Sequence, residues 1–178
     1  MEDVLVWVRA VLTGTPARWQ SLADTLPAEL VSQPPAPGEW SALECLQHLV
    51  DTERWVFHVR IQALLAGQDF PAFDPARQGT KPGAGRSPAA LSGEFARLRA
   101  DSLALLAQVG PADLGRKARH QELGLVTLGE LVHEWAAHDL MHTVQAERAV
   151  MQPFIRGSGP WQPSFVDHLA GGKPPKEG

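Results

Sequence analysis

The sequence predicts an all-α protein folded as a four-helix bundle, and three observations lead to this prediction. Long stretches without proline alternate with Gly- and Pro-rich clusters at 34–38, 67–88, 110–115 and 153–178. Apolar residues recur at helical spacing inside those stretches, for example Leu91, Phe95 and Leu98. The sequence contains no strong period-2 run and no Asn-Gly or Asp-Gly hairpin signal.

Length and composition indicate one domain. The 178 residues carry a formal net charge of −4, and we expect a bundle domain over 1–160 followed by a partly disordered tail over 161–178. Mild acidity and scattered Lys and Arg argue against a nucleic-acid or membrane partner. The N-terminus has acidic residues where a signal peptide has positive charge, and a single cysteine, Cys45, forms no internal disulfide. We therefore expect a cytoplasmic protein.

The first two long helices have recognisable start signals. Residues 2–13 are expected to form a short helix that is interrupted near Gly14. A second segment then begins with Thr15 as N-cap and Pro16 at the first helical position. The next helix, 41–66, begins with a Ser41–Glu44 capping box and ends at Gly67 in the left-handed position.

The last two long helices also have recognisable start and end signals. One begins at Ser87-Pro88 and stops before Gly110, and the other begins with a Thr127–Glu130 capping box and runs to about Val150, before Pro153. The connection of about twenty residues between the second and third long helices is long enough to cross the bundle, which lets those helices lie parallel. Residues 116–126 show only a weak extended pattern.

Two histidines on the last helix predict a metal site. His138 and His142 are four residues apart, about 40° around the helix axis, so both side chains can reach one ion. His133 is five residues before His138, about 140° away, and a zincin HExxH motif would need its second histidine at Ala137. The sequence therefore does not predict a zincin metalloprotease.

His48 is the best third ligand, because catalytic metal sites usually take three protein ligands. It lies in the middle of the 41–66 helix, which can meet the last helix in the bundle core. His58, His120 and His168 are expected at the surface or in loops, and Cys45 as a buried thiol. Glu134 is either an outer hydrogen-bond acceptor for a ligand or a partner for a nearby charge. The spacing alone leaves open that His138 and His142 are satisfied core histidines that bind no metal.

The sequence resembles the DinB-like (DinB/YfiT) superfamily of bacterial metal-binding bundles. The matching residues, over roughly 15–150, are Gly38-Glu39-Trp40-Ser41, Glu44, His48-Leu49, Glu53, Arg119-His120, Gly124, Thr127-Leu128, Glu130-Leu131 and 138–145 (HDLMHTVQ). The resemblance implies an up-down-down-up four-helix bundle with a long crossover between helices 2 and 3, commonly a homodimer. It also implies a divalent metal, zinc or nickel, held by His48, His138 and His142.

Members of this superfamily include thiol-dependent transferases, so the resemblance implies a metal-dependent transfer of a low-molecular-weight thiol to a small electrophile. The alternative is a non-catalytic, metal-dependent binding or stress-response module, in which Glu134, Asp139 or Asp51 would close the metal shell as a fourth ligand. Phe70, Phe73 and Asp74, in the connection after Gly67, are expected to line the mouth of the site.

Overall fold

The structure, a computed structural model, describes residues 3–73 and 86–171. Eleven elements are described in chain order: α1 (Asp3–Thr25), α2 (Ala28–Ser32), α3 (Ala42–Thr52), the π-helical turn η1 (Glu53–Phe57), α4 (His58–Ala66), α6 (Pro88–Leu106), the 3₁₀ turn η2 (Pro111–Gly115), β1 (Lys117–His120), β2 (Gly124–Thr127), α7 (Leu128–Gly157) and the 3₁₀ segment η3 (Gly159–His168).

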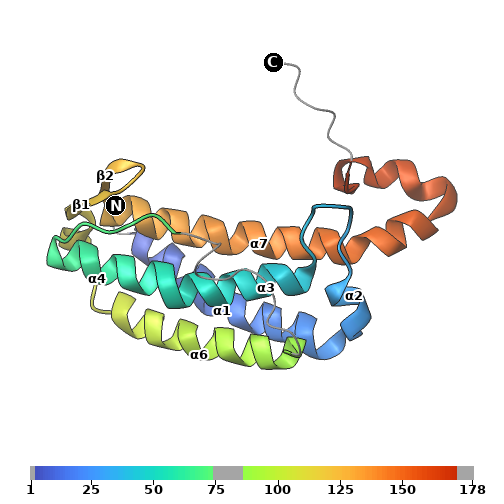
Figure 1. The fold of residues 1–178 in the computed structure, drawn as a ribbon, viewed down its shortest axis with the longest axis horizontal. Helices are drawn as coiled ribbons and strands as arrows, with labels where there is room; N and C mark the ends of the chain where they lie inside the picture. The colour runs from blue at the N-terminus through green and yellow to red at the C-terminus, as the bar shows by residue number, and fades with distance from the viewer. Residues whose placement is uncertain (1–2, 74–85, 172–178) are drawn as a thin grey trace, which may run out of the picture.

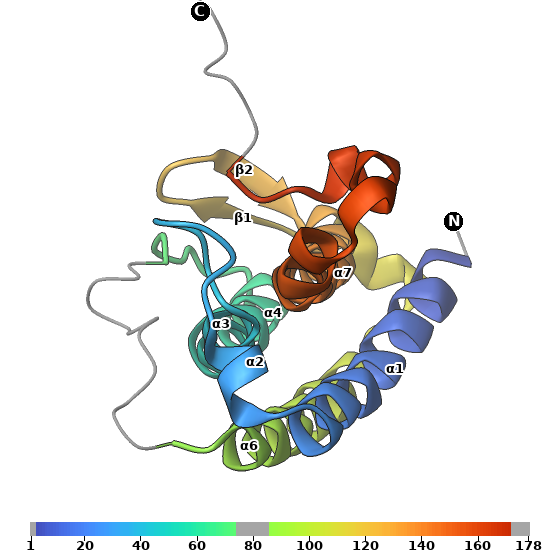
Figure 2. The same cartoon turned by 90° about the vertical axis from the view of Figure 1, so that its right-hand side faces the viewer.

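The four long helical units form a bundle with up-down-down-up topology, as predicted. They are α1, the continuous unit α3–η1–α4, α6 and α7 (Figure 1). Viewed along the bundle, α6 packs between α1 and the α3–α4 unit, and α7 closes the ring on the opposite side (Figure 2). Helices α4 and α6 run in the same direction, as the colours in Figure 1 show.

The structure confirms the predicted helix starts at Ser41, Ser87 and Thr127. Ser41 Oγ accepts from the Glu44 N–H at 3.2 Å while the Glu44 carboxylate accepts from the Ser41 N–H at 2.8 Å. An equivalent capping box begins α7, and Ser87 caps α6. Gly67 ends α4 at φ 65°, where a side chain would be strained. Local hydrogen bonding therefore fixes where the long helices begin.

The predicted break at Gly14 is wrong, because α1 continues through Thr15 and Pro16. A proline inside a helix has no N–H for the carbonyl four residues earlier, which here is Leu12. The Arg99 guanidinium donates to that carbonyl at 3.0 Å, and Thr15 Oγ also approaches it, at 3.4 Å. A side chain from α6 thus replaces the missing helical donor.

Three further local features differ from the sequence prediction. The expected 41–66 helix contains the π turn η1, and α7 continues past Pro153 to Gly157. Residues 117–127, most of them in the segment with the weak extended pattern, form an antiparallel hairpin, β1 with β2, in which Lys117 faces Thr127. This hairpin has no Asn-Gly or Asp-Gly turn; Gly124, at φ 78°, follows the turn.

The C-terminal segment η3 packs on α7. Arg148 donates to the carbonyl of His168 at 3.2 Å, and Gln152 donates to the same carbonyl at 2.9 Å. The end of the expected tail, 172–178, lies outside the described residues. In the described part of the chain, no helix combines the length and the apolar character needed to cross a bilayer.

The core consists of two apolar clusters with a polar layer between them. One cluster contains Leu12, Val56 and Trp135, and the other contains Trp19, Leu49 and Phe95. In each long helical unit, buried polar residues lie between the members of the two clusters, and they include Thr15, Glu53, Arg99 and Asp139.

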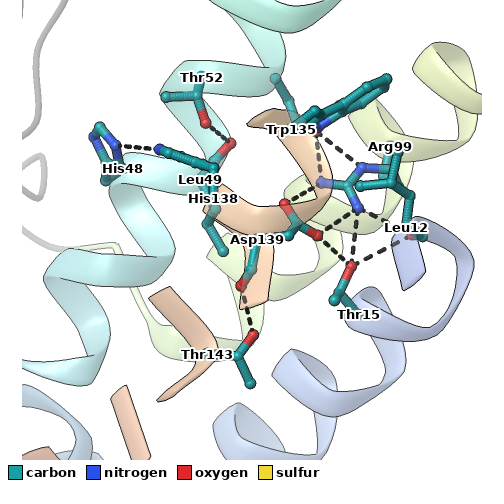
Figure 3. Close-up of polar contacts among 11 residues, drawn as sticks. Leu12, Thr15, His48, Leu49, Thr52, Arg99, Trp135, His138, Asp139 and Thr143 are labelled. Carbon is teal, nitrogen blue, oxygen red and sulfur yellow. Dashed lines mark hydrogen bonds and ion pairs between the residues drawn. The ribbon is translucent and has the colours of Figure 1, made fainter. Parts of the chain in front are cut away.

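Arg99 is the centre of this layer (Figure 3). Its guanidinium donates to both oxygens of Asp139, at 2.7 and 2.8 Å, and to Glu53 Oε1, at 2.6 and 2.9 Å. Thr15 Oγ accepts from Arg99 at 2.9 Å and donates to Asp139 at 2.5 Å, while the Trp135 indole N–H donates to Glu53 at 3.0 Å. One buried side chain therefore bonds to all three other long helical units.

We predict that Arg99→Met destabilises the fold by about 3–5 kcal/mol, because it leaves the Glu53 and Asp139 carboxylates buried without their cation. Urea denaturation measures this loss in the free energy of unfolding. The matched control is Arg97→Met on the same helix, whose pair with Asp101 is mostly exposed and whose loss should cost less than about 1 kcal/mol.

Thr15→Val tests the same layer more gently, since it removes only the hydroxyl that serves Asp139 and Arg99. A loss of about 1–3 kcal/mol is expected. Equal stability of the Arg99→Met and Arg97→Met proteins would contradict the central role of the layer.

Candidate metal centre

The three predicted ligand residues come together between α3 and α7. His48 lies in the middle of α3 and is buried; His138 and His142 lie one turn apart on α7, half-buried and buried respectively. Helices α3 and α7 pack directly on each other, and the capping boxes at their starts fix the residues that begin each helix. Two segments about ninety residues apart in the sequence therefore supply one cluster.

The distances between the imidazoles are those of a shared site. The Nε2 atoms of His48 and His138 are 3.0 Å apart (Figure 3). The ring centroids of His142 lie 4.7 Å from His48 and 4.5 Å from His138. One candidate ligand atom from each of the three residues lies within 4.8 Å of the other two.

Aromatic rings surround the cluster. Trp40, directly before the α3 capping residue, stacks on His142 with a centroid distance of 5.8 Å and also contacts His48. Phe73 meets His48 edge-on, and Phe57 in the π turn meets His138 in the same way. Phe73 was expected at the mouth of the site and contacts it; Asp74 lies outside the described residues.

Burial keeps the three imidazoles neutral. The pKa of His48 falls from its ordinary 6.5 to about 4, mainly through desolvation and then through the neighbouring His142. The pKa of His138 falls to about 3, first through desolvation, then through His142 and His48, and last through Arg99. Desolvation also lowers the pKa of His142, against the opposing effect of its hydrogen bond to Gln145. Neutral imidazoles keep the lone pairs that bind metal ions.

This donor set fits a divalent transition metal. Nitrogens bound tetrahedrally to one zinc ion lie about 3.3 Å apart, close to the separation of the His48 and His138 Nε2 atoms. His142 Nδ1 lies 2.9 Å from Gln145 Oε1, an acceptor, so Nδ1 carries the proton and Nε2 keeps its lone pair. The role of Gln145 could have been inferred from its position three residues after His142, within reach on a helix.

Carboxylates are not part of the cluster that the described residues form. Both oxygens of Asp139 are bound by Arg99, and one also by Thr15. Asp51 accepts from Gln47, and Glu134 lines a separate cavity beside Arg60. Cys45 is buried, which raises the pKa of its thiol to about 12. The expected candidates for a fourth ligand thus have other surroundings.

The other histidines are separate from the cluster. His133 is exposed on α7, and His58 is paired with Gln62 on the outer side of α4. His120 was expected at the surface or in a loop, and this is wrong: it ends strand β1 and is only 5% exposed. It packs edge-on against Phe70, and the weak strand pattern of 116–126 did not reveal that contact.

Comparison with known proteins agrees with this architecture. A family profile described as the DinB superfamily matches residues 12–146. The solved structure titled "YfiT from Bacillus subtilis is a probable metal-dependent hydrolase with an unusual four-helix bundle topology" aligns with a TM-score of 0.73 and 18% identity, over 86% of this chain and 89% of that one. Such an identity shows a shared fold. No curated protein matches the chain.

The lowered pKa values predict how the stability of the metal-free protein depends on pH. Below pH 6.5, His48 and His138 become protonated in the unfolded state but stay neutral in the folded state. The free energy of unfolding therefore falls as the pH drops from 6.5 towards 4. Each histidine contributes a slope of up to about 1.4 kcal/mol per pH unit.

Urea denaturation across this pH range, with a chelator present, measures the slope. The His48→Gln/His138→Gln protein should show a smaller slope than wild type. Asp51, whose pKa burial raises to about 6, acts in the opposite direction, but it is present in both proteins and cancels in the comparison. Identical slopes would show that the two imidazoles are not held neutral by the fold.

Proposed function

The chain belongs to the DinB superfamily, and on that ground we propose that His48, His138 and His142 bind one divalent metal ion, zinc or nickel. We further propose that the metal-loaded protein is an enzyme that transfers a low-molecular-weight thiol to a small electrophile. The observation that carries both proposals is the meeting of three neutral imidazoles from α3 and α7 within 4.8 Å.

The composition of the cluster favours catalysis over a purely structural role. Structural zinc sites use four protein ligands, whereas catalytic sites use three and leave one position for water or substrate. The three histidines are joined by no acidic or thiolate group among the described residues. A divalent ion held by neutral ligands keeps its full charge and lowers the pKa of a nucleophile that binds it.

The acidity of thiols and the absence of a free carboxylate base at Asp139 favour a thiol as that nucleophile. A thiol has an ordinary pKa near 8.5, so a modest lowering of its pKa gives the reactive thiolate without a protein base. Metal-assisted hydrolysis often uses a carboxylate base beside the metal, and Asp139, the acid next to His138 in sequence, is held by Arg99 instead. In the proposed transfer the sulfur bonds to the electrophilic carbon, the leaving group departs, and the thiol proton passes to solvent.

The residues around the cluster would bind and orient the reactants. Trp40, Phe57 and Phe73 present aromatic surfaces around the imidazoles, and such walls exclude water from a reacting group. Gln145 holds His142 in one orientation.

Hydrolysis is the second candidate, favoured by the published description of YfiT as a probable metal-dependent hydrolase. A non-catalytic binding module is the remaining alternative. It would require a fourth protein ligand, and the separate surroundings of Asp139, Asp51 and Glu134 weigh against it.

We predict that wild-type protein, purified without an affinity tag and dialysed with zinc or nickel, retains about one metal equivalent per chain. His142→Ala should retain far less, and His133→Ala is the matched control because it removes an exposed histidine from the same helix. Elemental analysis gives the metal content. Metal should also raise the melting temperature of wild type and of His133→Ala but not of His142→Ala.

We predict that metal-loaded wild type conjugates a small thiol to an activated model electrophile at least about 100-fold faster than His142→Ala, an effect the size of losing one important catalytic group. Loss of free thiol and formation of the thioether are measured together, with His133→Ala as control. A parallel assay with an activated ester tests hydrolysis. Ester cleavage that depends on His142, without thioether formation, would replace the transferase proposal by the hydrolase.

A further inference from the structure

A cavity of about 140 Å³ lies between α4, the β1–β2 hairpin and the start of α7. These elements meet at one end of the bundle (Figure 1). Its lining residues are half apolar and half polar: Phe70, Leu123, Val126 and Leu131 are apolar, and Arg60, His120, Glu130 and Glu134 are polar. It shares no residue with the histidine cluster, and neither the family match nor the structural match assigns it a role.

The hydrogen bonds of His120 fix its tautomer. Its Nδ1 accepts from the backbone N–H groups of Glu122 and Leu123, at 3.1 and 3.2 Å. A neutral imidazole has one acceptor nitrogen, so Nε2 carries the proton and is a donor. Burial and the nearby Arg60 lower the pKa of His120, which favours this neutral form.

Arg60 presents a second donor to the same point. Its Nη2 atom lies 3.2 Å from His120 Nε2, and a guanidinium has donors only. Two donors cannot bond to each other, so this contact is not a hydrogen bond between the two side chains. Within residues 3–73 and 86–171, no carboxylate oxygen lies within 4.0 Å of the Arg60 guanidinium.

Two donors that converge in one cavity favour an acceptor placed between them. A carboxylate is the simplest group that accepts from an arginine and a neighbouring N–H together. Glu130 and Glu134 also line the cavity and would repel a bare anion, so a ligand gains by presenting its own donor, such as an ammonium or hydroxyl group, to Glu134.

We propose that this cavity binds the head group of a small carboxylate with an adjacent ammonium or hydroxyl group, its carboxylate held by Arg60 and His120 and its donor by Glu134. The cavity is smaller than the roughly 300 Å³ of a typical complete ligand site, so it holds one end of a ligand. Phe70 holds the two donor side chains of this site in place. It packs on His120 and also lies under the Arg60 guanidinium, with 5.4 Å between the ring centroid and Arg60 Cζ.

The cavity lies about one helical turn from the metal centre along α7. Glu134 is four residues, one helical turn, before His138 on α7. Arg60 is three residues after Phe57, which contacts the His138 ring. A ligand anchored here can extend towards the histidines, and the statement that it is then the enzyme's substrate rests on the proposed function.

Binding is tested on the metal-free protein, so the result does not depend on the metal. The probes share a three-carbon skeleton: propionamide, propionate, lactate and alanine, each titrated at constant ionic strength while the ¹⁵N signals of the His120 ring are followed by NMR. Lactate and alanine should bind with affinity on the order of millimolar, propionate more weakly, and propionamide not at all.

Arg60→Met should weaken carboxylate binding by at least about tenfold, the effect of losing one charged hydrogen bond. Arg119→Met is the matched control, since it removes an exposed guanidinium next to His120 in sequence. Arg60→Lys keeps the charge but not the forked donors, so it should also weaken binding and serves if the Met variant does not fold. Glu134→Gln should reduce the preference for alanine over propionate.

Several outcomes would overturn the proposal: no saturable shift with any acid at tens of millimolar, equal binding by the Arg60→Met and Arg119→Met proteins, or ¹⁵N shifts that place the proton on Nδ1. Nickel loading then tests the connection to the metal centre. The protons of bound alanine should relax faster in nickel-loaded wild type than in nickel-treated His142→Ala. If the alanine protons relax equally in the two proteins although wild type has bound nickel, the carboxylate site stands but lies too far from the metal to serve it.

Discussion

The bidentate pairing of Arg99 with Asp139, shared with Glu53, is the interaction on which the remaining architecture depends. Arg99 comes from α6, Asp139 from α7, Glu53 from the π turn, and Leu12 and Thr15 from α1. Buried charges are tolerated only when they are paired and hydrogen-bonded, so the four helical units must keep the register that satisfies this guanidinium. The same demand explains why α1 tolerates Pro16, because the freed Leu12 carbonyl becomes one of the acceptors.

The geometry of the metal cluster depends on this polar layer. His138 directly precedes Asp139, and His48 lies five residues before Glu53 on the helix that leads into the π turn. Fixing Asp139 and Glu53 around one guanidinium therefore sets how α3 and α7 face each other, and with it the 3.0 Å separation of the two imidazole nitrogens. Apolar packing alone permits small slides of one helix along another, whereas a bidentate ion pair favours one register.

Sequence reasoning succeeded where the physics is local. Capping boxes, the left-handed Gly67 and the four-residue spacing of His138 and His142 each depend on a few neighbouring residues, and the convergence with His48 followed from placing both stretches in mid-helix. Sequence reasoning failed where the local structure depends on a residue far away in the sequence. The continuity of α1 through Pro16 depends on Arg99, which is more than eighty residues away, and the burial of His120 depends on Phe70. The π turn has no signal in the sequence that we recognise.

Helix α7 shows how one regular spacing produces two chemical environments. Glu130, Glu134, His138 and His142 follow one another at four-residue intervals, so each lies about 40° around the axis and about 6 Å along it from the last. The angular spacing is small enough to keep neighbours near one face, so the sequence left Glu134 as a candidate hydrogen-bond acceptor for His138, beside the alternative of a partner for a nearby charge. The axial rise separates them, because Glu134 lies opposite Arg60 and the hairpin while His138 lies opposite His48 on α3. What a residue on this face does is therefore set by the element that packs against its own turn of α7.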